Sequence, residues 1–71
     1  MNRFGQKLRA LREHYDLSYR RLGAELDIDH THLAKIEAGR ALPSFELIIK
    51  IAKYFDVSFD ELLDDEIDLK L

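Results

Sequence analysis

One stretch of the chain, residues 18–40, constrains the possible fold more than any other. It begins at Ser18, a residue type that caps helix N-termini well, and Leu22 and Leu26 then share one face of a helix predicted over residues 19–26. A second helical pattern follows after only a few residues. The connection between the two helices therefore has room for a sharp corner and for nothing longer.

The second helix of this stretch carries its own start and stop signals. Asp29 is a good N-cap, and Ile28 and Leu33 stand at the spacing of a hydrophobic staple, which fixes the angle at which the chain enters the helix. Leu33 and Ile36 form the inward-facing stripe. Gly39 follows as the C′ residue at which the helix is expected to stop.

A small residue completes the pattern of these two helices. Gly23 has no side chain and can therefore lie where two helices cross closely. Two helices, a corner of about three or four residues and a small residue at the crossing together predict a helix-turn-helix.

Amphipathic segments flank this motif on both sides. Before it, Phe4, Leu8 and Leu11 recur at i, i+4 and i+7, as on one face of a helix. After it, a broad apolar stripe predicts a central packing helix, and Ser58 and Glu61 form a capping box for a last short helix. The five predicted helices cover residues 3–14, 19–26, 30–38, 45–55 and 59–63. The predicted fold class is all-α, with five helices around one core.

The ordered set of motifs resembles the DNA-binding domain of phage repressors and Cro, the large XRE-like helix-turn-helix family. It consists of LRALRE, two capped helices of which the second ends IEAGR, a proline, and a helix followed by FDVSFDELL, over roughly residues 4–63. Tyr19, Gly23 and Asp27 stand where the family usually has glutamine, alanine and glycine. The resemblance implies a phage-repressor-like fold and sequence-specific binding of double-stranded DNA by a transcriptional regulator, with repression as the expected action.

The resemblance also assigns residues to the DNA interface. His30, Thr31 and Lys35 match the family's usual base-reading positions; lysine can donate to guanine, and the threonine methyl can contact thymine. Ordinary solvated helix residues are the alternative reading of these three. The residues expected at the DNA backbone lie at helix starts and beside the second helix: Ser18, Tyr19, His32, Arg40 and Ser44.

Arg12 and Glu37 match a further pair of family positions, an arginine late in the first helix and a glutamate near the end of the third. The resemblance implies a structural ion pair, in which a fork-shaped guanidinium meets a carboxylate where two helices cross. The alternative is two unrelated surface charges.

Charge is distributed unevenly along the chain. The formal net charge is −3, but residues 1–53 hold 10 Lys or Arg against 7 Asp or Glu, and residues 54–71 hold 1 against 7. A locally positive face can bind phosphates even when the total charge is negative. We therefore expect a DNA-binding domain over residues 1–63 and an acidic tail over residues 64–71.

The tail also contains apolar residues that could join two copies of the chain. Leu63, Ile67 and Leu71 would share a face if the last helix continued, whereas Ile67, Leu69 and Leu71 would share one if the tail were extended. Both conformations predict a homodimer, which would place two recognition helices on paired half-sites. One alternative is an antitoxin-type role, in which the acidic tail binds a partner protein while the helical domain regulates its own gene. The other is a disordered tail that only aids solubility.

No enzymatic activity, metal or cofactor is expected. His30 and His32 stand at i and i+2 and point apart, which does not suit a shared metal ion. There is no glycine-rich phosphate loop and no nucleophile beside a base. The absence of cysteine, of a secretory signal and of an apolar run of membrane-spanning length predicts a cytoplasmic protein without membrane contacts.

Overall fold

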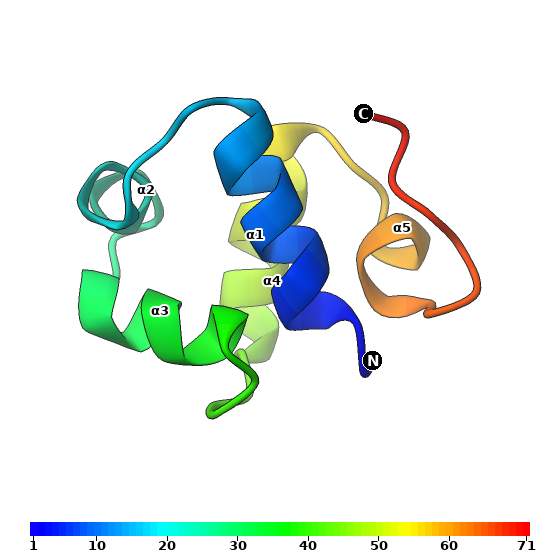
Figure 1. Ribbon diagram of the computed structural model, residues 1–71, viewed down its shortest axis with the longest axis horizontal. Helices are drawn as coiled ribbons and strands as arrows, with labels where there is room; N and C mark the ends of the chain where they lie inside the picture. Colours follow the sequence, from blue (N-terminus) through cyan, green and yellow to red (C-terminus); the bar gives the residue numbers. More distant parts are fainter.

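The computed structural model describes the whole chain, Met1–Leu71, as five helices without strands, which confirms the all-α fold class (Figure 1). The helices are α1 (Phe4–His14), α2 (Tyr19–Leu26), α3 (His30–Glu37), α4 (Phe45–Phe55) and α5 (Phe59–Leu63). The longest of them has 11 residues, and none is long and apolar enough to cross a membrane.

The bounds of α2, α4 and α5 agree with the prediction, whereas α1 begins one residue later and α3 ends one residue earlier than expected. Helix α3 stops at Glu37 because Ala38 is its C-cap and Gly39 takes the left-handed conformation, with φ of 78°. The Arg40 N–H then donates to Lys35 O at 2.8 Å and the Gly39 N–H donates to Ile36 O at 3.1 Å. These two bonds are the Schellman pattern, which satisfies the last carbonyls of the helix.

Four of the five helices begin at a residue whose side chain caps the helix N-terminus. The four capping side chains and the N–H groups from which they accept are Ser18 from Arg21, Asp29 from Thr31, Ser44 from Leu47 and Ser58 from Glu61. Aspartates occupy left-handed positions after three helices: Asp16, Asp27 and Asp56 have φ of 55°, 57° and 54°. Aspartate tolerates this region better than most residues, so the family's usual glycine is not required at position 27.

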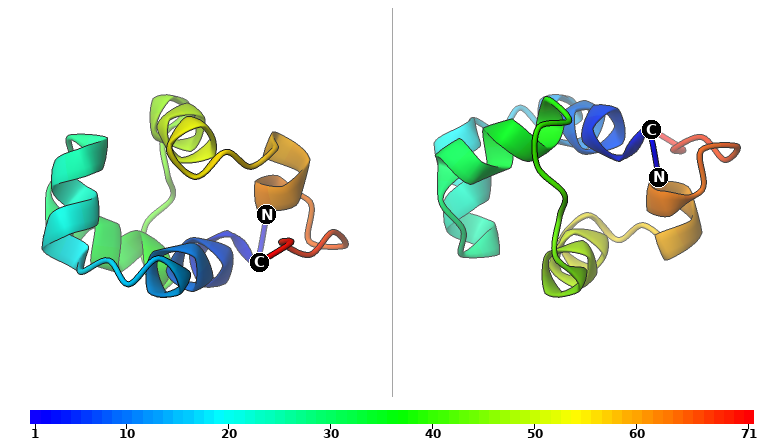
Figure 2. Two further views of the ribbon diagram at one scale, coloured as in Figure 1. Left: turned by 90° about the horizontal axis from the view of Figure 1, so that it is seen from above. Right: turned by 90° about the horizontal axis from the view of Figure 1, so that it is seen from below.

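One hydrophobic core holds the helices together. Helices α1 and α4 lie on opposite sides of it, with α2 and α3 at one end of the molecule and α5 at the other (Figure 2). Its thirteen buried members are Phe4, Leu8, Leu11, Leu22, Leu26, Leu33, Ile36, Leu47, Ile48, Ile51, Ala52, Phe55 and Leu62. They include the stripes that the sequence predicts for α1, α2, α3 and α4.

Lys7 is a buried charge of α1, although it is not one of the apolar residues that recur at i, i+4 and i+7 along that helix. It is 3% exposed, and its Nζ donates to Glu61 O at 2.6 Å, Asp64 O at 2.7 Å and Ile67 O at 2.6 Å. An ammonium has three donors, and the carbonyls at a helix C-terminus lack partners and carry partial negative charge. Lys7 therefore joins α1 to the end of α5 and to the tail.

The tail, residues 64–71, has neither of the two conformations expected for it: α5 ends at Leu63, and no strand follows. Instead, hydrogen bonds and an ion pair connect its residues to the start of the chain. The Asp65 carboxylate accepts from the backbone N–H of Asn2 at 2.8 Å and of Arg3 at 2.9 Å, so it caps the beginning of α1 from a distant part of the chain. Arg3 also pairs with Asp68 at 2.8 Å. The first residues of the tail therefore lie beside the start of α1, whereas the two chain termini are apart (Figure 1).

The apolar residues of the tail region are divided by this arrangement. Leu63 and Leu69 pack against the protein's own core, whereas Ile67 and Leu71 remain exposed. These four residues therefore do not form one apolar face. Such a face would require the regular side-chain spacing of a helix or a strand, and the tail is irregular.

Candidate nucleic-acid interface

Helix α3 lies at one edge of the molecule and presents one side to solvent (Figure 1). Leu33, Ile36 and Glu37 are buried, while Thr31 and Lys35 are exposed on the other side of the helix. The two exposed residues stand one turn apart, as the spacing i, i+4 requires. An exposed face of this kind has the dimensions to enter a DNA major groove.

His30 lies at the border of this face and is half-buried. It is close to α2: a Cβ atom added at Gly23 would lie 3.3 Å from the His30 Cα and 2.9 Å from Ile28 O. Glycine at position 23 therefore permits the close approach of α2 and α3 that the sequence predicts. The His30 side chain is 37% exposed, and its Nδ1 lies 3.7 Å from Asp29 Oδ1.

The first turn of α3 is organised by Asp29. One of its carboxylate oxygens, Oδ1, accepts from the Thr31 backbone N–H and from the Thr31 hydroxyl, both at 2.9 Å. These bonds hold the pKa of Asp29 below its ordinary value, the backbone bond having the larger effect. Since the hydroxyl of Thr31 donates to Asp29, its orientation is fixed before any ligand arrives.

The residues expected at the DNA backbone fall into two groups. Ser18, His32, Arg40 and Ser44 are exposed; Ser18 and Ser44 are the N-caps of α2 and α4. Tyr19 differs, because it is half-buried and the Arg12 guanidinium carbon lies 4.0 Å from its ring centroid. The sequence pattern contains no signal for this cation–π contact, which depends on how α1 and α2 meet.

Arg12 and Glu37 lie in direct contact. The Arg12 Nε donates to Glu37 Oε2 at 2.8 Å and its Nη2 donates to Oε1 at 3.2 Å, with side chains 11% and 2% exposed. The remaining terminal nitrogen, Nη1, donates to Leu17 O at 2.9 Å. The hydrogen bond with Glu37 raises the pKa of Arg12 above its ordinary value. This cluster joins α1, the loop before α2 and the end of α3, and thereby sets the position of α3.

Ion pairs within single helices decide which charges stay free. Arg21 pairs with Glu25 at 3.0 Å and Arg9 pairs with Glu13 at 3.5 Å. Lys35 and Arg40 have no such partner, and Glu37 is neutralised by its buried arginine. From the start of α3 to the start of α4, the uncompensated charges are therefore positive.

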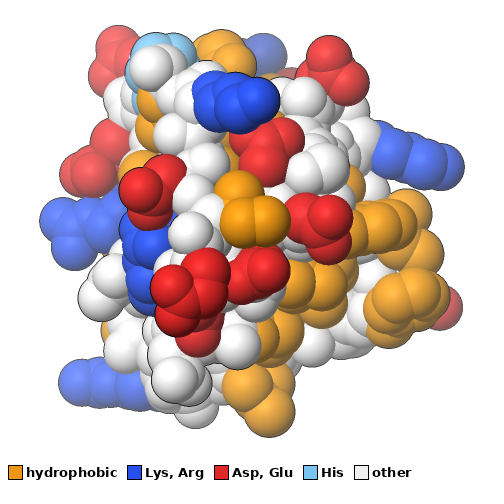
Figure 3. Space-filling model, turned by 90° about the vertical axis from the view of Figure 1, so that its right-hand side faces the viewer, with side chains coloured by type: hydrophobic (Ala, Val, Ile, Leu, Met, Phe, Trp, Pro, Cys, Tyr) orange, Lys and Arg blue, Asp and Glu red, His pale blue; other side chains and the backbone are white.

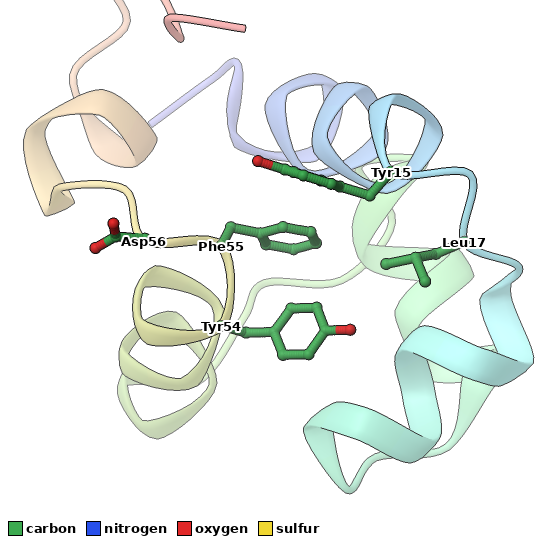
Figure 4. Close-up of a pocket in the computed structure, with 5 residues that line it drawn as sticks. All are labelled: Tyr15, Leu17, Tyr54, Phe55 and Asp56. Atoms are coloured by element: carbon green, nitrogen blue, oxygen red, sulfur yellow. The ribbon is translucent and has the colours of Figure 1, made fainter.

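The molecule has a second surface feature, an open hollow of about 460 Å³ between the ends of α1 and α4 (Figure 4). It is lined by Tyr15, Leu17, Tyr54, Phe55 and Asp56, and the rings of Tyr15 and Phe55 stack with centroids 5.6 Å apart. None of the residues expected to contact DNA lines this hollow.

Sequence comparison finds related proteins of known class. A family model described as helix-turn-helix matches residues 8–62. The HTH-type transcriptional activator BcrR of Enterococcus faecalis is 36% identical over 63 residues, which are 89% of this chain but 31% of that protein. Control protein C.MunI of a Mycoplasma species is 38% identical over 64 residues, which are 89% of this chain and 86% of that protein. The chain thus spans less than a third of the first relative and most of the second.

Structural comparison agrees with these matches. The crystal structure of the restriction-modification controller protein C.AhdI from Aeromonas hydrophila superposes with a TM-score of 0.78 at 32% identity, over 87% of this chain and 94% of that one. A chain of the SinR protein/SinI protein complex superposes with a TM-score of 0.81 at 26% identity, over 89% of this chain and 62% of that one. Both comparisons extend over nearly the whole five-helix fold.

Proposed function

The chain belongs to the XRE-type helix-turn-helix family of DNA-binding transcriptional regulators, and from this membership we propose that it binds a specific double-stranded DNA site and represses transcription there. The observation that carries the proposal is the exposed face of α3, on which Thr31 and Lys35 project beside uncompensated positive charge. Repression is the simplest action of such a domain, because a protein that occupies a promoter excludes polymerase from it.

We assign base reading to His30, Thr31 and Lys35. Lys35 can donate to the O6 and N7 atoms of guanine, and the Thr31 methyl group can contact the methyl group of thymine. His30, at the border of the face, would contact the groove at its edge. Because Lys35 and Thr31 are exposed and His30 is half-buried, we assign most of the base reading to Lys35 and Thr31.

We assign phosphate contacts to the residues around α3. At the starts of α2 and α4, backbone N–H groups and the N-cap hydroxyls of Ser18 and Ser44 suit anions. Arg40 contributes a free positive charge from the loop, and His32 lies on the exposed side of α3. Tyr19 would act through its hydroxyl, with its ring held by the arginine beneath it.

We propose that the DNA-bound form is a homodimer. A single recognition helix reads only a few base pairs, and domains of this type bind half-sites about 34 Å apart. The α5 side of the molecule suits a two-fold contact, since hydrophobic side chains gather there beside acidic ones (Figure 3). Its exposed apolar residues are Phe59, Ile67 and Leu71. Leu63 and Leu69 would contribute only by supporting this surface from within, because they pack against the core.

A role for the tail in binding a different protein has less support. Asp65 and Asp68 are already engaged by the start of the chain, so the acidic tail is not a free charged arm. We therefore do not propose an antitoxin-type function.

Selection of bound duplexes from a random DNA pool tests the proposal. We expect enrichment of a two-fold symmetric site with half-sites about one helical turn apart. Fluorescence anisotropy should then give at least about a thousandfold tighter binding to the selected duplex than to a scrambled one. Equal affinity for both duplexes would contradict sequence-specific binding. A reporter gene placed behind the selected site decides the sign of regulation, and increased expression would contradict repression.

A further inference from the structure

Two large apolar side chains stand out from the surface between α3 and α4. Leu42 is 81% exposed and Phe45 is 72% exposed, whereas no other large hydrophobic residue of the chain exceeds 54%. Neither side chain belongs to the core, although a leucine and a phenylalanine lose much free energy by facing water. Exposed apolar residues of this size often mark a surface that another molecule covers.

The segment that carries them is ordered on both sides. Before it, the Schellman bonds at the end of α3 hold Arg40, and after it the Ser44 hydroxyl accepts from the Leu47 N–H at 3.1 Å. Pro43, between them, restricts the backbone further. Leu42 and Phe45 are therefore displayed on a defined loop and do not belong to a disordered segment.

The same segment continues the face proposed to meet DNA. Figure 1 shows α3 and the loop after it along one edge of the molecule, and the view from below in Figure 2 also places both on a common face. The charges that are free between residues 30 and 45 are those of Lys35 and Arg40. Carboxylates adjoin this stretch at both ends, those of Asp29 and Glu46, and the Asp29 carboxylate accepts from the Thr31 N–H. Two exposed apolar residues in a stretch whose own free charges are positive suit a polyanion that also presents apolar surface.

We propose that Leu42 and Phe45 pack against the deoxyribose rings of the DNA backbone, next to the phosphate that Arg40 contacts. Sugars alternate with phosphates along each strand, so a loop that binds a phosphate places its neighbouring side chains against the adjacent sugars. These contacts carry no sequence information and position the protein on the duplex. The inference rests on the proposed DNA binding and adds an apolar component to it.

Salt dependence separates this role from that of a phosphate contact. Replacing a cation that neutralises a phosphate lowers the slope of log K against log[salt] by about one unit, because fewer counterions are released. Removing an apolar contact weakens binding without changing the slope, since no ion is involved. Phe45→Ser and Leu42→Ser should each weaken binding about 5- to 20-fold, equally for the selected and the scrambled duplex, with the slope unchanged.

Tyr15→Ser is the control for the two serine variants. Tyr15 is also a large exposed side chain, but it lies just after α1, in the hollow that none of the residues expected to contact DNA lines. Tyr15→Ser should leave DNA affinity unchanged, and Arg40→Ala should lower the salt slope. Leu42→Ser and Phe45→Ser should keep the urea midpoint of the wild type, because both side chains are exposed. Leu42→Ser, which lies outside any helix, provides an independent second variant.

Each remaining outcome decides against the inference in a recognisable way. If the wild type binds duplex DNA and both serine variants bind it equally well, the apolar contact is absent while DNA binding stands. A loss shared equally by Phe45→Ser and Tyr15→Ser also contradicts it, because the effect is then not confined to this edge. If Phe45→Ser instead lowers self-association measured by sedimentation, the surface holds a second copy of the chain. A wild type that binds no duplex rejects the proposed function itself.

Discussion

Arg12 and Glu37 are 25 residues apart in the sequence and form a two-pronged ion pair between α1 and the end of α3. The same guanidinium donates to Leu17 O and lies against the ring of Tyr19. One arginine thus connects α1 to the loop before α2, to the start of α2 and to α3. Since α3 carries the proposed base-reading residues, this pair links the stability of the fold to the position of the DNA-binding surface.

Glu37→Gln should destabilise the protein by about 3 kcal/mol, because removing one partner of a buried pair leaves an uncompensated charge. In a domain of this size that corresponds to a fall in Tm of more than about 10 °C. Thermal unfolding followed by circular dichroism measures it. Glu13→Gln is the control, since Glu13 belongs to an exposed pair and its loss should cost less than about 1 kcal/mol. An unchanged Tm for Glu37→Gln would show that the pair is not structural.

Lys35→Ala and Arg40→Ala should separate base reading from phosphate binding. The lysine variant should weaken binding to the selected site by roughly 1–3 kcal/mol more than binding to scrambled DNA. The arginine variant should weaken both similarly and lower the salt slope by about one unit. Anisotropy titrations at several salt concentrations provide both quantities. If each variant loses specific and random binding in the same proportion, the assignment of Lys35 to base reading is wrong.

Lys7→Met should destabilise the protein by about 2 kcal/mol, because three backbone carbonyls lose their common donor. The effect should be largest at the tail, where amide hydrogen exchange is expected to increase for residues 64–71. Urea unfolding and exchange measured by NMR test the two parts. Lys53→Met is the control, since this lysine is exposed. Unaltered exchange in the tail of Lys7→Met would contradict the role given to Lys7.

Asp65 should contribute a pH-dependent part of the stability. Hydrogen bonds from the backbone N–H groups of Arg3 and then Asn2 lower its pKa from the ordinary value of 3.8. A carboxyl whose folded pKa is lowered stabilises the protein above its unfolded pKa, and this contribution disappears as the pH falls through the folded pKa. The Tm of Asp65→Asn should therefore fall less than that of the wild type when the pH is lowered from about 5 to about 2.5, the range in which carboxyl groups of this kind titrate. Glu66→Gln, at an exposed position, should follow the wild-type profile.

Gly5→Ala should be strongly destabilising for a steric reason. A Cβ atom at position 5 would lie 2.6 Å from both Ile36 O and Glu37 O, so α1 would have to move away from the end of α3. We expect a loss of about 2–3 kcal/mol, the range of overpacking in a close contact. Gly39→Ala provides the comparison: nothing lies within 4 Å of its added Cβ, and only the positive φ of 78° opposes it. That variant should lose about 1 kcal/mol. Equal losses in urea unfolding would mean that the α1–α3 contact is not tight.

The sequence by itself determined the helices, because their signals are local. Ser18, Ser44 and Ser58 each accept from an N–H three residues ahead, so the capping partner is fixed by the neighbouring residues. The stripes that enter the core follow the helical period in the same way. Residue types at matched positions also identified the family, and with it the candidate residues on α3.

Only the tertiary structure decided how distant segments meet. Lys7 lies beside the apolar stripe on a helical wheel, but nothing local identifies its partners, because its long side chain reaches carbonyls 54 to 60 residues away. The tail has two plausible periods in the sequence and follows neither, because Lys7 and the N–H groups at the start of α1 bind it in an irregular path. Likewise the contact of Tyr19 with Arg12 depends on the packing of α1 against α2. A hydrogen bond between remote residues leaves no periodic trace in the sequence, since the geometry that forms it exists only once the helices have packed.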